Sequence, residues 1–268
     1  DEALVRFHGA GWRTTSLTGT DADDAVALAR LAVAERPDVL VVCGGDGMIN
    51  LALQAVAGTD IPIGILPAGT GNDFARYFDL PLGDGAAAAT RIIDGTERTI
   101  DLARIGERYF GGVLAAGFDA VVNERANRMR WPRGQMRYNL ATLAELRVFK
   151  PLDYVLELDG VERRVQAMLV AVGNGPSFGG GLRITHGAEL DDGYLDVVLI
   201  KPVGRMELVR TFPKLFDGSH VTHPQYEHHL VRRVTIAAPG IVGYADGERF
   251  GPLPLTVECV PGAVRVRA

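Results

Sequence analysis

The sequence VLVVCGGDGMIN, residues 39–50, decides the fold of the N-terminal half of the chain. Its first four residues are apolar and mostly β-branched, as in the central strand of a parallel sheet. The turn GGDG interrupts this run, and Ile49, Leu53 and Val56 then recur at helical spacing. We therefore expect a strand, a tight turn and a helix. A β-hairpin is the alternative, because Gly-Asp-Gly also suits a hairpin turn.

The turn between this strand and helix has the chemistry of a phosphate site. Glycines leave backbone N–H groups bare, and the N-terminus of a helix carries positive potential. Asp46 is the acid within the turn. Beside a polyphosphate, its natural partner is Mg²⁺, because a bare carboxylate would repel the ligand. GGDG therefore favours nucleotide binding.

A second junction of the same kind follows. Residues 61–66, IPIGIL, predict another buried strand, and PAGTGNDFAR at residues 67–76 predicts a turn that opens a helix. Both turns would lie at the carboxyl ends of parallel strands, where α/β sheets bind ligands. Helix capping is the alternative role for Thr70, Asn72 and Asp73. The other expected elements of this half are a helix end at 1–8, a strand at 12–17, and helices at 21–35 and 84–93.

From about residue 99 the pattern changes from helical to strand-like. Short apolar runs separated by Asp-Gly turns predict an antiparallel sandwich. The runs are residues 100–105, 109–115, 154–158, 164–172, 195–200, 231–237 and 255–260. We therefore expect a Rossmann-like α/β nucleotide-binding domain over residues 1–98, apparently without its first strand, and an antiparallel β-sandwich domain over residues 99–268.

Composition narrows the classes of function. A formal net charge of −5 over 268 residues argues against general nucleic-acid binding. Cys43 and Cys259 lie far apart in sequence and show no disulfide or metal spacing, as expected of a cytoplasmic protein. No apolar run approaches the length of a membrane span, and no signal peptide is visible. Any lipid would therefore be reached from the water side.

One segment of this acidic chain is locally basic. Residues 123–138 hold five arginines, with Met129, Trp131 and Met136 between them. Trp and Arg together suit peripheral contact with an anionic membrane surface at its inner face. A solvated helical face with apolar residues packed inward is the alternative. The arginines are Arg125, Arg128, Arg130, Arg133 and Arg137.

Taken in order, GGDG, PAGTGNDFAR, DDGYLDV and YADGERF resemble the soluble bacterial diacylglycerol kinase family, related to the sphingosine and ceramide kinases. The resemblance covers essentially the whole chain. It implies an α/β nucleotide domain and a β-sandwich with the active site in the cleft between them. It also implies ATP with Mg²⁺ as phosphate donor and the primary hydroxyl of a lipid, by default diacylglycerol, as acceptor.

The resemblance assigns nucleotide-binding roles to three segments. The second junction contributes Thr70 as a nucleotide contact, with Asn72 and Asp73 in the same motif. Thr18 matches a further threonine contact. The ATP-binding loop comprises Gly44, Gly45, Asp46, Gly47, Met48, Ile49 and Asn50.

A structural Mg²⁺ site is implied at the DDGYLDV motif. Its ligands would be the carboxylate of Asp192 and the main-chain carbonyls of Glu189 and Tyr194. The alternative is an Asp-Gly hairpin with solvated acids.

The YADGERF motif matches the catalytic acids of the family. A primary alcohol is a poor nucleophile at neutral pH, so phosphoryl transfer needs positioning, charge neutralisation and a proton acceptor. The resemblance implies Glu248 as the acceptor, and we expect Asp246 to orient it and Asp46 to hold the metal and phosphates. Asp46 as the base is the competing assignment, and a plain hairpin turn is the alternative for Asp246 and Glu248. The acyl chains are expected along residues 110–118 and the Phe178-Gly-Gly-Gly segment.

The sequence departs from the family pattern at two places. The first strand of the family and its Asn-Pro-x-x-Gly phosphate loop are absent from the sequence, and Met48 stands where a threonine is usual. Both departures are expected to affect the affinity for ATP. Other functions stay open: a kinase of monoacylglycerol, a sphingoid base or phosphatidylglycerol, a soluble NAD-kinase-like metabolite kinase, or a non-catalytic lipid- or nucleotide-binding protein. A homodimer is also open.

Overall fold

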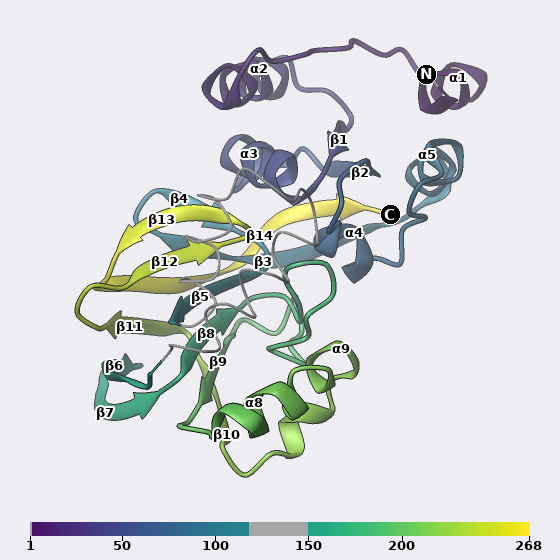
Figure 1. Cartoon of the computed structure of the whole chain (residues 1–268). Helices are drawn as coiled ribbons and strands as arrows, with labels where there is room; N and C mark the ends of the chain where they lie inside the picture. Colours follow the sequence, from purple (N-terminus) through teal and green to yellow (C-terminus); the bar gives the residue numbers. More distant parts are fainter. Residues whose placement is uncertain (1, 118–149) are drawn as a thin grey trace.

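The computed structural model describes residues 2–117 and 150–268. The basic segment at 123–138, with its expected membrane contact, lies outside the described residues. Figure 1 shows helices α1, α2, α3 and α5 at one end of the molecule, β-sheets in the middle and helices α8 and α9 at the far end. In the part of the chain that is described, no helix is long and apolar enough to span a membrane.

The N-terminal half contains the expected strand–turn–helix junctions. The strands β1 and β2 are parallel, with Val42 opposite Ile65, and the GGDG turn opens α3 directly, so the hairpin alternative is wrong. The elements are α1 (Glu2–Gly9), α2 (Ala22–Ala34), β1 (Leu40–Gly44), α3 (Asp46–Val56), β2 (Ile63–Pro67), α4 (Asp73–Tyr77) and α5 (Gly85–Asp94).

One expected strand of this half does not form. Residues 12–19 have no regular secondary structure, and the side chains from Arg13 to Thr18 are exposed. Trp12 instead stacks on Phe7 of α1, with ring centroids 5.3 Å apart. The β-branched threonines favour a strand, but a strand needs a neighbour to accept its hydrogen bonds, and no described strand lies beside this segment.

The C-terminal half is a sandwich of antiparallel strands, as expected. One sheet has six strands in the order β10-β9-β8-β5-β12-β13, and the other has eight, including β1 and β2. The strands are β3 (Glu97–Ile105), β4 (Arg108–Phe110), β5 (Val113–Gly117), β6 (Leu152–Leu158), β7 (Val161–Ala167), β8 (Leu169–Gly173), β9 (Leu195–Ile200), β10 (Tyr226–Val231), β11 (Arg233–Ala237), β12 (Val242–Ala245), β13 (Glu248–Pro252) and β14 (Leu255–Arg267). The helices of this half are α8 (Arg205–Thr211), α9 (Lys214–Asp217) and the 3₁₀ helix η1 (Ser219–Thr222).

Two apolar runs that predict single strands each form two strands in different sheets. The chain crosses between sheets within one or two residues, so the run stays apolar through the crossing. Strands of both sheets bury their side chains in a shared core, which includes Phe110, Leu114 and Val170. The pairs are β4 and β5, divided at Gly111-Gly112, and β7 and β8, divided at Met168. The run at 231–237 forms β11, and β10 before it was not expected.

Strand β14 joins the two halves of the molecule. It pairs antiparallel with β11 and β3, and its last residues, Val266 and Arg267, pair parallel with β2. The boundary expected after residue 98 falls inside β3. In Figure 1 the yellow strand β14 runs from the sandwich to the nucleotide half and ends near β2. Val266, Ile63 and Leu102 are fully buried in the core around it.

Candidate active site

Two glycine turns meet at the carboxyl ends of β1 and β2. A Cβ atom on Gly69 would lie 2.4 Å from the Cα of Gly45, and one on Gly45 would lie 3.0 Å from the Cα of Gly69. The amide of Ala68 donates to the carbonyl of Gly44 at 3.0 Å. Glycine is therefore needed at both positions because the two backbones touch.

The side chain of Asn72 closes the second turn. Asn72 is buried in the left-handed region, with φ 52°. Its Oδ1 accepts from the amide of Gly69 at 2.9 Å, and its Nδ2 donates to the carbonyl of Gly69 at 2.8 Å. Asn72 therefore shapes the turn, and the exposed Thr70 lies on its open side.

A cleft of about 270 Å³ opens where these turns face the sandwich. The nucleotide half contributes Asp46, Thr70 and Asp73 to its wall, and the sandwich half contributes Ser177 and Asp246. Three of the four motifs, GGDG, PAGTGNDFAR and YADGERF, therefore share one cavity with the segment at 177–180. Two segments, 46–74 and 177–180, supply most of the remaining lining.

Asp46 begins α3 and points into the cleft. Its Oδ1 accepts a hydrogen bond from the amide of Phe74 at 3.0 Å, which ties the first turn to α4. Its Oδ2 lies 2.9 Å from the position of a Cβ on Gly71. No described residue donates a hydrogen bond to this Oδ2, so it is open to a ligand.

Asp73 joins the second turn to the sandwich half. It is buried, and it accepts hydrogen bonds from Ser177 Oγ at 3.0 Å and from the amides of Gly180 and Gly181 at 2.6 and 2.8 Å. Burial raises the pKa of Asp73, and the nearby charge of Asp46 acts in the same direction, while the three donors oppose it. Asp73 therefore anchors the glycine loop at 179–181.

Asp246 lies in a two-residue hairpin turn between β12 and β13, where Asp246 and Gly247 have φ of 51° and 83°. Its carboxylate accepts from the amides of Gly111, Gly112 and Val113 at 3.1, 3.3 and 3.2 Å. Burial raises the pKa of Asp246 to about 6, and the charge of Asp46 adds to this, while the backbone donors lower it. Asp246 therefore lies in a hairpin turn, as the alternative interpretation had it, and also lines the cleft.

Glu248 stands at the rim of the cleft. It begins β13, its side chain is exposed, and its Oε1 lies 3.6 Å from the position of a Cβ on Gly47, in the first turn of α3. No hydrogen bond or ion pair joins its carboxylate to another described residue. Glu248 therefore lies beside the first turn of α3, and its chain neighbour Gly247 lines the cleft.

The remaining residues of the predicted ATP loop have different surroundings. Ile49 is buried and lines the cleft, whereas the side chain of Met48 is 42% exposed. Gly44 faces Met48, where a Cβ would lie 2.6 Å from that of Met48. Asn50 is buried and directs its amide toward Asp246 Oδ2 at 3.5 Å and the carbonyl of Tyr109 at 3.4 Å.

Sequence reasoning missed Tyr77 at the base of the cleft. Its hydroxyl donates to the carbonyl of Ser177, and burial raises its pKa well above the ordinary value. A Cβ on Gly112 would lie 3.1 Å from this hydroxyl, and one on Gly175 would lie 2.6 Å from the ring. Tyr77 thus packs between the two halves. No local pattern indicates this role, although Ser177 directly precedes the Phe178-Gly-Gly-Gly segment.

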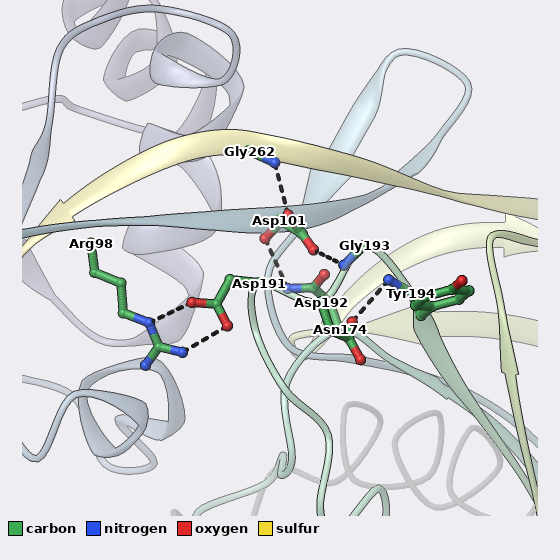
Figure 2. Close-up of polar contacts among 8 residues, drawn as sticks. All are labelled: Arg98, Asp101, Asn174, Asp191, Asp192, Gly193, Tyr194 and Gly262. Atoms are coloured by element: carbon green, nitrogen blue, oxygen red, sulfur yellow. Dashed lines mark hydrogen bonds and ion pairs between the residues drawn. The ribbon is translucent and has the colours of Figure 1, made fainter.

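Thr18 and the predicted structural metal ligands lie outside the cleft. Thr18 is exposed. Glu189 is exposed, and Asp192 Oδ1 accepts from the amide of Tyr194 at 2.9 Å within the turn shown in Figure 2. This geometry is that of an Asx-turn.

Asp101 holds the turn of Figure 2 in place. It is buried on β3, and its two carboxylate oxygens accept from the amides of Gly193 and Gly262, both at 2.7 Å. Nearby, the exposed Asp191 pairs with Arg98 at 3.0 Å.

The cleft suits a magnesium-bound phosphate ligand better than a metal held by protein alone. The described residues contain no group of three or more His, Cys, Asp or Glu side chains placed to hold a metal ion. Mg²⁺ is usually bound through one or two carboxylates together with substrate phosphates and water. The free Oδ2 of Asp46, at the N-terminus of α3, fits that pattern.

Comparison with known families agrees with this architecture. The model of the diacylglycerol kinase catalytic domain matches residues 2–105, and that of the YegS C-terminal NAD kinase beta sandwich-like domain matches residues 112–268. A diacylglycerol kinase of Mycobacterium tuberculosis is 46% identical over 270 residues, covering 98% of this chain and 87% of the relative. One from Bacillus subtilis is 28% identical over 257 residues, covering 94% and 85%.

Solved structures share the fold. A putative diacylglycerol kinase from Bacillus anthracis superposes with a TM-score of 0.82 at 23% identity, covering 99% of this chain and 88% of that one. An NAD kinase from Archaeoglobus fulgidus in complex with ATP gives a TM-score of 0.56 at 14% identity, covering 100% and 90%. The two family models and the mycobacterial relative together show that this chain belongs to the bacterial family of diacylglycerol kinase and YegS-like lipid kinases.

Proposed function

We propose that the protein transfers the γ-phosphate of ATP to the primary hydroxyl of diacylglycerol and so produces phosphatidic acid at the inner face of the cytoplasmic membrane. The observation that carries this proposal is the shared cleft, in which Asp46 and Asp73 from one half face Asp246 from the other. The names of the relatives support diacylglycerol as the acceptor.

The nucleotide half supplies the phosphate-binding groups. The amides at the start of α3 would bind the phosphates, and the close contact of Gly45 with Gly69 holds the second glycine turn beside them. Asp46 Oδ2 would hold Mg²⁺. When bound, Mg²⁺ neutralises the phosphate charge that would otherwise repel the attacking alcohol. Thr70 on the opposite turn contacts the nucleotide.

Glu248 is the proposed proton acceptor. Its carboxylate is free of described partners, whereas the carboxylate of Asp246 is engaged by three backbone amides. Asp246 therefore acts by fixing the hairpin turn that carries Glu248, and its charge adds to the field at the cleft. Glu248 would take the hydroxyl proton of the acceptor as the oxygen–phosphorus bond forms.

A second, apolar cavity supports a lipid acceptor. A space of about 80 Å³ lies beneath α8 and α9 and is lined almost wholly by apolar side chains, among them Leu169, Leu208 and Phe212. Phe178 lines both this cavity and the catalytic cleft. An acyl chain could therefore lie beside the reacting hydroxyl. In the other expected acyl-binding segment, 110–118, Phe110 is fully buried in the core and lines neither cavity, Gly112 lines the cleft, and Phe118 lies outside the described residues.

Two variants separate the proposed roles. Glu248→Gln should lower kcat by about 10²–10⁴-fold, as expected for loss of a proton acceptor, and leave ATP affinity unchanged. Asp46→Asn should lower both kcat and the affinity for magnesium-bound ATP. Glu162→Gln changes an exposed acid on β7 and serves as the control. Near-normal turnover by Glu248→Gln would refute the assignment of Glu248.

The acceptor is tested with radiolabelled ATP against a panel of compounds. Diacylglycerol, monoacylglycerol, a sphingoid base and phosphatidylglycerol are presented in mixed micelles, and NAD⁺ is presented in solution. The proposal predicts the highest kcat/KM with diacylglycerol. Phosphorylation of NAD⁺ in preference to every lipid would contradict a lipid kinase, and preference for another lipid would contradict diacylglycerol as the acceptor.

A further inference from the structure

We propose that helices α8 and α9 form a membrane-docking surface that seats the protein on a bilayer with anionic headgroups. This inference rests on the proposed function, because a lipid acceptor must enter the protein from a bilayer. The surface consists of Met206 and Val209 on α8, Phe216 on α9, and the cations Arg210 and Lys214 beside them. We call it the α8–α9 surface.

The apolar part of this surface is unusually exposed. The side chains of Met206, Val209 and Phe216 are 69%, 49% and 50% exposed. Met206 and Val209 are three residues apart on α8 and therefore share one face of the helix. Three large apolar side chains are thus exposed on two consecutive short helices, whereas single exposed apolar residues are common on protein surfaces.

The same helices cover the apolar cavity from the other side. Leu208 and Phe212 face inward and line the cavity, while Met206 and Val209 face solvent. Phe212 and Phe216 lie edge to face, with centroids 6.1 Å apart, and so connect the cavity wall to the outer surface. An acyl chain that leaves a bilayer at this surface would enter an apolar environment without crossing water.

The charges on these helices favour an anionic membrane. The acids are engaged locally: Glu207 contacts His223 at 3.1 Å, and Asp217 accepts from both the amide and the hydroxyl of Ser219. Arg210 and Lys214 are exposed and form no ion pair with any residue of the described part of the chain. In a protein of net charge −5, these free cations beside apolar side chains match the interface of an anionic bilayer.

Vesicle binding by the full chain tests the surface directly. Co-sedimentation is measured with vesicles of phosphatidylglycerol and phosphatidylcholine, and with phosphatidylcholine alone. The triple variant Met206→Gln, Val209→Gln, Phe216→Gln should bind the mixed vesicles about tenfold or more weakly than the wild type. Arg210→Gln with Lys214→Gln should lose about fivefold per charge on mixed vesicles and little on phosphatidylcholine alone.

A matched control changes exposed apolar side chains elsewhere. Leu31 on α2 and Val161 on β7 are 63% and 64% exposed, and Leu31→Gln with Val161→Gln should bind vesicles as the wild type does. Wild-type protein that does not bind mixed vesicles, a triple variant that binds normally, or a control that loses as much would overturn the proposal. A triple variant whose oligomeric state changes while vesicle binding stays intact would identify a protein interface and would also overturn it.

The binding measurement is independent of catalysis. Vesicle binding through the α8–α9 surface without phosphorylation of any lipid would contradict the proposed function and leave the docking surface standing. With catalysis intact, the triple variant should keep its kcat/KM for a short-chain, water-dispersed diacylglycerol and lose it for the same lipid in vesicles. An equal loss on both substrates would mean that the variant damages the cavity, and the docking role would then be rejected.

Discussion

Substituting Gly69 by alanine should separate the two glycine turns and lower turnover. The new methyl group would lie 2.4 Å from the Cα of Gly45, whereas carbon atoms in contact normally lie about 3.5–4.0 Å apart. The turns must therefore move apart by about 1 Å. Asp46 follows Gly45 directly, so its carboxylate would move relative to Thr70. A misplacement of about 1 Å at a reacting centre costs about 10²-fold in rate, and we expect kcat to fall by that factor.

The assay is steady-state kinetics with diacylglycerol, combined with circular dichroism and thermal unfolding to show that the variant is folded. Gly45→Ala gives a milder clash, at 3.0 Å, and should cause a smaller loss. Gly85 begins α5, has negative φ and has no atom within 4 Å of its Cβ position, so Gly85→Ala should leave kcat unchanged. A folded Gly69→Ala variant that keeps kcat within a few-fold of the wild type would refute the claim that contact between the turns positions Asp46.

Three further outcomes follow from the contacts around the cleft. Because the pKa of Asp246 is raised to about 6, its carboxylate is ionised at pH 7 and gains a proton as the pH falls through 6. The value of kcat/KM should then drop about tenfold per pH unit below pH 6. A pH profile that stays flat down to pH 5 would contradict this. Asp101→Ala leaves two amides without their acceptor and should lower the free energy of unfolding by about 2–4 kcal/mol in urea titrations, whereas Asp191→Ala, at an exposed ion pair, should cost less than about 1 kcal/mol. Tyr77→Phe removes the donor to the Ser177 carbonyl and should lower the free energy of unfolding by about 1–3 kcal/mol. It should also reduce kcat more than ATP affinity. An equal free energy of unfolding for the variant and the wild type would show that this hydrogen bond is dispensable.

The fold of the nucleotide half could be predicted because its signals are local. A β-branched run, a glycine turn and a helical repeat all lie within residues 39–56, and they specify β1 and α3 without reference to distant residues. The strand expected at 12–17 does not form, because a strand depends on neighbouring strands that its own sequence does not reveal. The crossings at Gly111-Gly112 and Met168 were missed because both strands of each pair contribute side chains to the same core.

The residues of the site likewise divide into those with a local sequence signal and those that depend on distant partners. Asp46, Asp73 and Asp246 are found in sequence because each lies in a turn with a recognisable composition, and the structure brings all three into one cleft. The roles of Tyr77 and Asp101 could not be found, because their partners lie 92 to 161 residues away in sequence and their own surroundings resemble ordinary core strands and helices. Long-range hydrogen bonds leave no periodic trace in a sequence.

The sharing of β14 by both halves restricts how substrates can be enclosed. A rigid-body rotation that closed the cleft would shear the ladder between β14 and β3 and pull Val266 away from β2, breaking several backbone hydrogen bonds at once. Enzymes whose lobes are joined by a flexible tether do not face this cost. We therefore expect the distance between the acidic side chains on the two sides of the cleft to be fixed when the chain folds. Substrate capture would then depend on rotations of side chains such as Glu248 and on small movements of the glycine loop at 179–181.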